Sequence, residues 1–213
     1  MNRPVFVLIA TLLLMAAGLS AIVADPQSVV GKLQPTEGYP QGVFGSAQQG
    51  SDVYVRAGCV ECHTQQVRGV DSDLALYGPR RTVARDYLGL AKPLLGNSRI
   101  GPDLSNVGVR YQGRESDLYK ILLSPDGYFG GSMMPSHRFL FERVQEEDAA
   151  PDVDLDLARD LAEVVGLEKG ELYVPTAEAD SLVSYLASLK RDAALTEAPT
   201  RASTDTDSGE SAE

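Results

Sequence analysis

Residues 59–63 have the sequence Cys-Val-Glu-Cys-His, the Cys-x-x-Cys-His pattern that attaches a c-type haem. Two thiols on one helical turn each add to a haem vinyl group, and the histidine that follows lies beneath the iron as an axial ligand. Cys59 and Cys62 are the only cysteines in the chain. The pattern therefore predicts one covalent haem c, attached at Cys59 and Cys62, with His63 as an iron ligand.

Two other kinds of site use a Cys-x-x-Cys pair. A structural zinc ion takes four nitrogen or sulfur ligands, and beyond residues 59–63 the chain offers only His137 as a ligand of these types. A thioredoxin-like redox site lies next to a βαβ pattern, and no such pattern surrounds this motif. Haem attachment is the interpretation that fits the motif and its surroundings best.

A methionine thioether is a common second axial ligand in electron-carrying cytochromes, where it raises the reduction potential. Two of the four methionines lie near the N-terminus, which leaves Met133 and Met134 in the sequence Gly-Gly-Ser-Met-Met-Pro at 130–135. Proline fixes the backbone after Met134, and the glycines let the loop approach a flat ring closely. We expect Met134 as the ligand, with a gap-filling core methionine as the alternative. His137 is a further candidate ligand, but we expect it on the surface.

A Gly-Pro turn at 101–102 lies between the haem motif and the methionine loop. In cytochromes c, a carbonyl of such a turn accepts the Nδ1 proton of the ligating histidine, which orients the imidazole and increases its basicity. By this order of motifs, we expect Pro102 to orient His63. Taken alone, the dipeptide predicts only a turn.

The N-terminus contains an uncharged run of 20 residues, from Val5 to Ala24. As a helix this run is about 30 Å long, the thickness of the hydrocarbon part of a bilayer. A cleaved signal peptide is the alternative, but its apolar region is shorter. Arg3 precedes the run, which places the N-terminus inside and the remaining chain outside the cytoplasm. Covalent haem attachment also takes place outside the bacterial cytoplasm, so the two inferences agree.

The chain is acidic, with a net charge of −11 and a pI of about 4.6. This charge argues against nucleic acid as a partner, and it suits a basic partner surface. Much of it lies in two segments, however. Residues 142–171 contain 11 Asp and Glu against three Lys and Arg, and residues 198–213 are rich in Ser, Thr, Asp and Glu. A segment of the second kind is expected to be disordered.

The chain is expected to have four parts: a transmembrane anchor (1–25), an irregular lead-in (26–46), one α-helical domain (47–190) with an insertion at about 142–174, and a disordered acidic tail (191–213). Within the domain, helices are expected at 48–57, 116–123, 153–165 and 176–190, and no strand pattern is convincing. Gly50 and Tyr54 are expected to meet Tyr185 and Leu189 where the first and last of these helices cross.

The order of these motifs resembles subunit II of the cbb3-type cytochrome c oxidases, the mono-haem, membrane-anchored cytochrome subunit. Residues 54–68, 101–108 and 132–135 carry the resemblance, which covers 5–140 and again 176–190. Family members usually have Met where Gln66 stands and Pro where Gly69 stands. The insertion at 142–174 is longer than the family pattern implies.

The resemblance implies an all-α fold, in which an N-terminal transmembrane helix precedes a class I-like cytochrome c domain with an acidic insertion. It implies a non-catalytic electron-transfer subunit of a haem–copper terminal oxidase, which relays single electrons from a donor cytochrome towards the catalytic subunit. The implied partners are the lipid bilayer, the donor cytochrome, the catalytic haem–copper subunit and a further cytochrome subunit. The implied location is the bacterial inner membrane, with a single pass and the soluble domain on the periplasmic side.

Arginines are candidates to bind the haem propionates, because a guanidinium group binds a carboxylate through two parallel N–H groups. Arg68 lies within the family-like run and leads, followed by Arg99 and Arg110. For each of them, a surface arginine is the alternative.

Two other functions stay open at this point. An independent membrane-anchored cytochrome c that serves another respiratory complex would share the haem chemistry and differ in its partner. A haem-based gas sensor would leave the sixth iron position open, and Met134 would then have no role at the iron.

Overall fold

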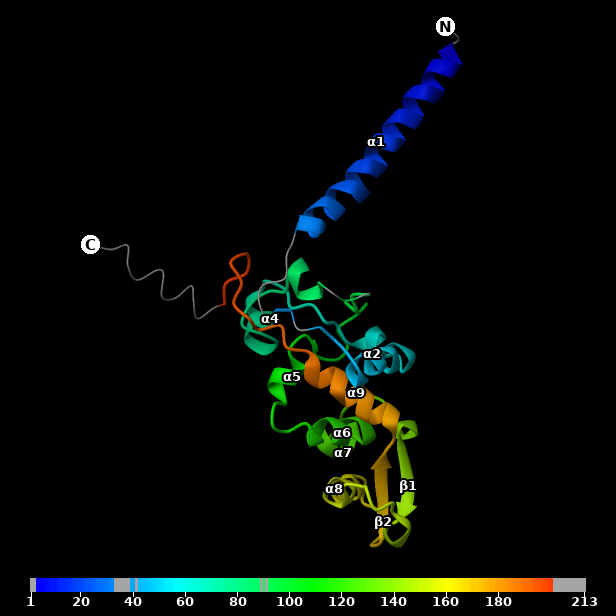
Figure 1. Cartoon of the computed structure of the whole chain (residues 1–213), viewed down its shortest axis with the longest axis vertical. Coiled ribbons are helices and arrows are strands. Elements are labelled where there is room, and N and C mark those ends of the chain that lie inside the picture. Colours follow the sequence, from blue (N-terminus) through cyan, green and yellow to red (C-terminus); the bar gives the residue numbers. More distant parts are fainter. Residues whose placement is uncertain (1–2, 33–38, 41, 89, 91, 201–213) are drawn as a thin grey trace, which may run out of the picture. The chain divides into compact units, whose positions relative to one another are not determined.

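The computed structural model describes residues 3–32, 39–40, 42–88, 90 and 92–200 (Figure 1). The chain forms two compact units, Met1–Gln41 with Val83–Gly89, and Gly42–Thr82 with Leu90–Glu213. Each is described by itself below.

The first unit contains helix α1 (Arg3–Lys32) and the short 3-10 helix η1 (Ala84–Tyr87). The segment Arg3–Ile22 of α1 is long and apolar enough to cross a membrane, and its side chains are exposed, as a lipid-facing helix requires. The segment therefore has the length, the apolar composition and the exposed side chains of a single-pass membrane anchor. In η1, the carboxylate of Asp86 accepts a hydrogen bond from the hydroxyl of Tyr39.

Helix α1 is longer than the anchor expected from the sequence. It continues to Lys32, although residues 26–46 were expected to be irregular and Pro26 stands just past the expected end of the anchor. Proline has a helical φ and costs a helix one backbone hydrogen bond, so it does not have to end one. Part of the expected lead-in, residues 33–38 and 41, lies outside the described residues.

Helices make up most of the regular secondary structure of the second unit. Its α-helices are α2 (Ser46–Arg56), α3 (Cys59–Cys62), α4 (Asp71–Leu76), α5 (Val107–Arg110), α6 (Ser116–Leu123), α7 (Pro125–Phe129), α8 (Leu155–Val165) and α9 (Ala177–Ser188). Two 3-10 helices, η2 (Arg138–Leu140) and η3 (Glu146–Asp148), flank strand β1 (Phe141–Gln145), and strand β2 (Glu171–Pro175) precedes α9. The four expected helices are confirmed as α2, α6, α8 and α9, with ends within two residues.

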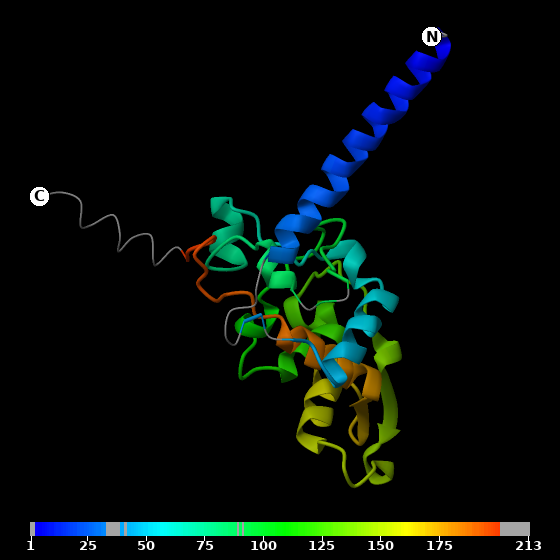
Figure 2. The same cartoon turned by 45° about the horizontal axis from the view of Figure 1, so that its top comes forward.

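Helices α2 and α9 cross at close range, as expected (Figure 2). A Cβ atom at Gly50 would lie 1.8 Å from the carbonyl oxygen of Ser181, so only glycine permits this approach. One turn further on, the rings of Tyr54 and Tyr185 meet edge to face with centroids 5.5 Å apart.

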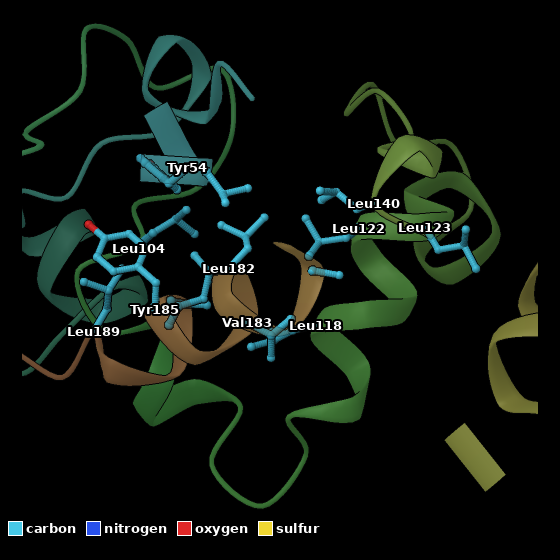
Figure 3. Packing of buried hydrophobic residues seen from close by; sticks show 14 of the residues in the cluster. Tyr54, Leu104, Leu118, Leu122, Leu123, Leu140, Leu182, Val183, Tyr185 and Leu189 are labelled. Carbon is cyan, nitrogen blue, oxygen red and sulfur yellow. The ribbon is translucent and has the colours of Figure 1, made fainter. Parts of the chain in front are cut away.

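The hydrophobic core lies around this crossing and extends to α6. Figure 3 shows Leu118 of α6 beside Val183 of α9, with Leu182 and Tyr185 further along the same helix. Partly buried side chains pack against the core from outside, among them Cys59, Val60, Tyr111 and Met134. The haem motif and the methionine loop therefore both border the same core.

The insertion contains a two-stranded sheet that the sequence did not reveal. β1 and β2 pair antiparallel, with Phe141 opposite Pro175 and Gln145 opposite Glu171. α8 covers the sheet through a small apolar cluster of Ala158, Ala162 and Leu172. Each strand has five residues and several of them are charged, so no alternating apolar pattern marks it. The all-α prediction is corrected to a mostly helical fold with this small sheet.

The first part of the expected disordered tail is ordered. Arg80 donates a hydrogen bond of 2.6 Å from Nε to the carbonyl oxygen of Ala193, and Leu195 is buried. Residues 191–200 therefore pack against the domain. Backbone carbonyl groups of this segment accept hydrogen bonds from the domain, and its apolar side chains are buried. Residues 201–213 lie outside the described residues.

Candidate functional site

Residues 59–63 form a single helical turn followed by extended chain. Gly58 precedes the turn in the left-handed region, with φ 77°, where glycine is the residue that fits best. The backbone N–H of His63 donates a 2.9 Å bond to the carbonyl of Cys59 and closes the turn. Both cysteines are half-buried free thiols. This geometry puts two thiols on one turn and an imidazole directly after it.

The environment of Cys59 gives no support to a redox-disulfide site. Burial, with a smaller contribution from the neighbouring Cys62, raises the pKa of Cys59 to about 11. Redox-active cysteines instead have a lowered pKa, because the thiolate is the reacting form. Nor does a group of three or more His, Cys, Asp or Glu side chains converge anywhere in the described part of the chain, as a zinc site would require.

The turn at 101–102 lies against the imidazole of His63. Nδ1 of His63 is 2.8 Å from the carbonyl oxygen of Pro102, the pair expected from the order of motifs. With the proton on Nδ1, the ring donates to this carbonyl, and the lone pair on Nε2 is left for a metal ion. A Cβ atom at Gly101 would lie 2.3 Å from Cε1 of the ring. The glycine therefore makes room for the imidazole in this orientation.

A second glycine near His63 was not singled out from the sequence. Gly96 has φ +85°, and a Cβ atom there would lie 2.2 Å from the carbonyl oxygen of His63. An isolated Gly-Asn dipeptide predicts only a turn, so the close backbone approach could not be foreseen.

The methionine loop is attached to the end of α6. The hydroxyl of Ser136 donates a 2.6 Å bond to the carbonyl of Leu123. Met134 is half-buried and packs against the same core as Cys59, whereas the side chain of Met133 is 86% exposed. Of the two methionines, Met134 is thus the one that packs against the same core as the haem motif.

His137 is buried, so the prediction of a surface histidine is wrong. Only 7% of the residue is exposed, and Nδ1 finds no hydrogen-bond partner within the described structure. Its backbone N–H donates a 2.8 Å bond to the carbonyl of Leu122, which fixes the residue beneath the loop. Burial lowers the pKa of His137, so the ring is neutral at pH 7.

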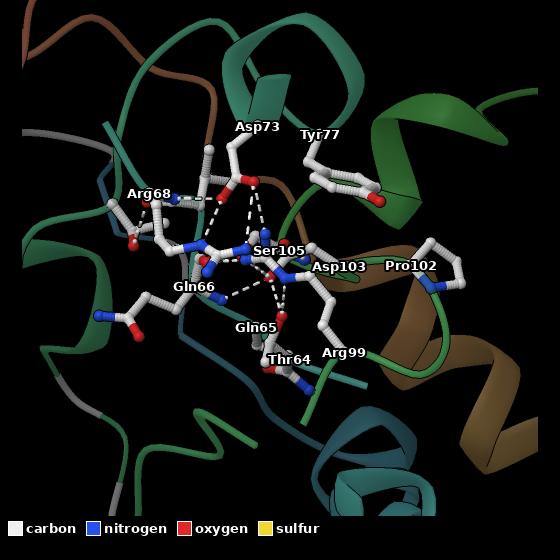
Figure 4. Close-up of polar contacts among 12 residues, drawn as sticks. Thr64, Gln65, Gln66, Arg68, Asp73, Tyr77, Arg99, Pro102, Asp103 and Ser105 are labelled. Carbon is white, nitrogen blue, oxygen red and sulfur yellow. Dashed lines mark hydrogen bonds and ion pairs between the residues drawn. The ribbon is translucent and has the colours of Figure 1, made fainter. Parts of the chain in front are cut away.

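Arg68 and Arg99 meet at the buried carboxylate of Asp73 (Figure 4). Arg68 donates to it at 3.1 Å and Arg99 at 2.5 Å. Burial alone would raise the pKa of Asp73, but the hydrogen bonds from Arg99 and Arg68 outweigh it and lower the pKa to about 2. The sequence did not reveal that Asp73 binds both arginines, because an acidic residue in the first turn of a helix is ordinary.

Arg110 has different surroundings. Its Nη2 donates a 2.8 Å bond to the carbonyl of Asp103, and its guanidinium lies 5.9 Å from the centre of the Tyr77 ring. In the described structure its Nη1 is buried and has no hydrogen-bond partner. Buried polar groups are almost always paired, so this position fits an anionic group that the protein alone does not supply.

The residues present fit a covalently held haem. The donor set is two free thiols, an imidazole with Nε2 available and a thioether, which are the groups that bind haem c. Gly101 leaves space at the imidazole, and the unpaired Nη1 of Arg110 fits a propionate.

Comparison with known families gives a match that covers most of the chain. The family model described as cytochrome c oxidase, mono-heme subunit/FixO matches residues 1–165. The matched range includes α1, the motif at 59–63, the turn at 101–102 and the methionine loop. No curated protein matches the chain significantly.

Proposed function

The chain belongs to the mono-haem subunit family of cytochrome c oxidases, and from this premise we propose that it is the electron-transfer subunit of a cbb3-type haem–copper terminal oxidase. It relays single electrons from a donor cytochrome towards the catalytic subunit and does no oxygen chemistry itself. The observation that carries the proposal is the contact of His63 Nδ1 with the Pro102 carbonyl, directly after a one-turn cysteine pair.

Cys59 and Cys62 attach the haem. The two thiols would hold the haem through thioether bonds to its vinyl groups. The short helix α3 holds both thiols on one turn, and the packing of Cys59 against the core fixes the position of one of the two attachment points.

His63 and Met134 are the proposed axial ligands. When bound, the haem supplies a one-electron Fe(III)/Fe(II) couple. The bond to Pro102 keeps the proton on Nδ1 of His63 and leaves the lone pair of Nε2 for the iron. The thioether of Met134 favours the reduced form and raises the potential.

Arg110 is the proposed partner of a propionate. Arg68 and Arg99 bind the carboxylate of Asp73, and Arg99 also pairs with that of Asp103, so the two positive charges are compensated within the protein. The buried Nη1 of Arg110 has no such partner in the described structure. A carboxylate there would satisfy it with a charge-assisted hydrogen bond.

Helix α1 anchors the chain in the membrane. Its apolar span fits the bilayer, and Arg3 at its start favours an N-terminus in the cytoplasm and a domain on the periplasmic side. The anchor keeps the haem domain beside its proposed partners, the catalytic haem–copper subunit and a further cytochrome subunit.

The proposal is tested by mild-detergent purification from native membranes through a tag on this chain, followed by reduced-minus-oxidised spectra and oxygen uptake. We expect c-type and b-type haem bands together with oxygen consumption that carbon monoxide inhibits. A single c-type haem without oxygen uptake would instead identify an independent membrane-anchored cytochrome c. A haem that binds carbon monoxide in the isolated chain would point to a gas sensor.

A further inference from the structure

Asp103 is a fully buried carboxylate directly after Pro102. Its Oδ2 accepts hydrogen bonds from the hydroxyl of Thr64 at 2.6 Å and from the backbone N–H of Gln66 at 2.7 Å. Its Oδ1 accepts a bond from the backbone N–H of Ser105 at 2.8 Å. Figure 4 shows the carboxylate between the chain that follows the haem motif and the turn that carries Pro102.

These contacts connect the two partners of the His63–Pro102 bond. Thr64 directly follows His63, and Asp103 directly follows Pro102, so the Thr64–Asp103 contact lies one residue away from the pair. The contacts with Gln66 and Ser105 lie three residues after His63 and Pro102. A backbone bond of 2.8 Å from Leu104 N to the carbonyl of Thr64 runs parallel to them. The carboxylate of Asp103 therefore joins the chain that follows His63 to the turn that carries Pro102.

Arg99 compensates the buried charge. Its Nη2 lies 3.4 Å from Oδ2 of Asp103, and its Nε donates a 2.9 Å bond to the hydroxyl of Thr64. Its Nη1 is bound to Asp73, so the guanidinium is held from the opposite side. A buried carboxylate that is paired and fully hydrogen-bonded has one fixed position, which is the property that a positioning group needs.

We propose that Asp103 is a positioning residue that sets the strength of the His63–Pro102 hydrogen bond and, through it, the reduction potential of the haem. The proposal rests on the proposed function, because it requires a haem on His63. A strong bond at Nδ1 increases the basicity of the imidazole and favours Fe(III). A looser bond favours Fe(II), and the potential rises.

The test uses the full-length, haem-loaded chain with Asp103→Asn. The side-chain amide keeps the size of the carboxylate, but it cannot accept hydrogen bonds from Thr64, Gln66 and Ser105 together, because one of its two polar atoms is a donor. We expect the equilibrium constant for reduction to rise about tenfold, which is about 59 mV for a one-electron couple. The electron paramagnetic resonance g values of the oxidised haem are expected to shift with it, because they report on the axial ligands.

Asp73→Asn is the matched control for charge. It removes one negative charge from the same cluster, but within the described structure Asp73 makes its hydrogen bonds to Arg68 and Arg99 and not to Thr64, Gln66 or the 101–102 turn, and it acts on them only through Arg99. We expect unchanged g values and a smaller change in the equilibrium constant. Thr64→Val is the second test variant, because it removes one bond of the Asp103 carboxylate without changing any charge. We expect it to raise the equilibrium constant about threefold, with a smaller shift of the g values.

The outcomes separate the proposal from its premise. Unchanged potential and g values in Asp103→Asn overturn the positioning role, and so does an equal shift in Asp73→Asn, which would show a charge effect only. If Asp103→Asn does not fold, Thr64→Val decides in the same way. If the wild-type chain carries no covalent, six-coordinate haem, the proposed function fails first, and that is seen in the wild-type spectrum alone.

Discussion

The haem-motif region and the insertion of this protein are held together in different ways. Around His63, two glycines permit close approach, and the buried side chains of Asp103 and Asp73 accept hydrogen bonds from backbone N–H groups. In the insertion, a small apolar cluster supports the sheet, and the ion pairs lie on the surface, as between Arg159 and Glu146. A substitution near the motif leaves buried donors or acceptors without a hydrogen-bond partner. A substitution in a surface ion pair of the insertion leaves the remaining group hydrogen-bonded to water.

The largest effect is expected at the cysteines. Cys59→Ala with Cys62→Ala removes both covalent attachments, so the haem should extract completely into acid acetone, while the wild-type haem stays with the protein. Absorption of the acetone phase measures the difference. A matched control is Arg159→Ala in the insertion, from which no haem should extract. Haem retained by the double variant would contradict covalent attachment at these positions.

Met134→Leu tests the methionine loop and is expected to have the next largest effect. Loss of the thioether opens the iron to carbon monoxide and lowers the potential, because the ligand that favours Fe(II) is gone. Met133→Leu is the control, since the side chain of Met133 is 86% exposed and its loss should change neither property. Carbon monoxide difference spectra and redox titration measure both. If the two variants exchanged their behaviour, Met133 would be the ligand.

Acid stability distinguishes the buried carboxylate of Asp73 from the exposed ones of the insertion. Its pKa is lowered from the usual 3.8 to about 2, so it stabilises the fold above about pH 4 and loses this effect as the pH falls through about 2. By linkage, the contribution is about 2 kcal/mol. The difference in unfolding free energy between wild type and Asp73→Asn, measured by urea titration, should shrink by about this amount from pH 5 to pH 2. A difference that does not depend on pH would contradict the role of the two arginines.

The smallest effect is expected for the surface ion pair of the insertion. Both Arg159 and Glu146 are exposed, and exposed pairs contribute little because water and salt compete with them. Arg159→Ala should therefore leave the urea midpoint and the haem spectrum at their wild-type values. A clear loss of stability would show that the insertion depends on this pair more than its apolar cluster suggests.

The parts of the structure that local sequence determines could be predicted. The motif at 59–63, the four longer helices and the crossing of Gly50 with α9 each follow from patterns within a few residues or from a known order of motifs. The contact of Pro102 with His63 was expected for the same reason.

The parts that tertiary packing determines could not be predicted. Arg68 and Arg99 were expected as possible partners of the haem propionates, which stays a prediction; both also bind Asp73, and nothing within their own segments indicates this partner. The burial of His137 depends on a bond to α6, and the order in residues 191–200 depends on arginines more than 100 residues earlier, such as Arg80. The sheet of the insertion depends on a pairing between two short segments 30 residues apart.

The central claim is that residues 59–63 and Met134 hold one covalent, six-coordinate haem. The most direct measurement is the absorption spectrum of the purified full-length chain, reduced, with and without carbon monoxide, combined with acid-acetone extraction of the same sample. The predicted result is one c-type haem per chain that resists both carbon monoxide and extraction. A haem that extracts, or one that binds carbon monoxide readily in the wild-type chain, would contradict the claim.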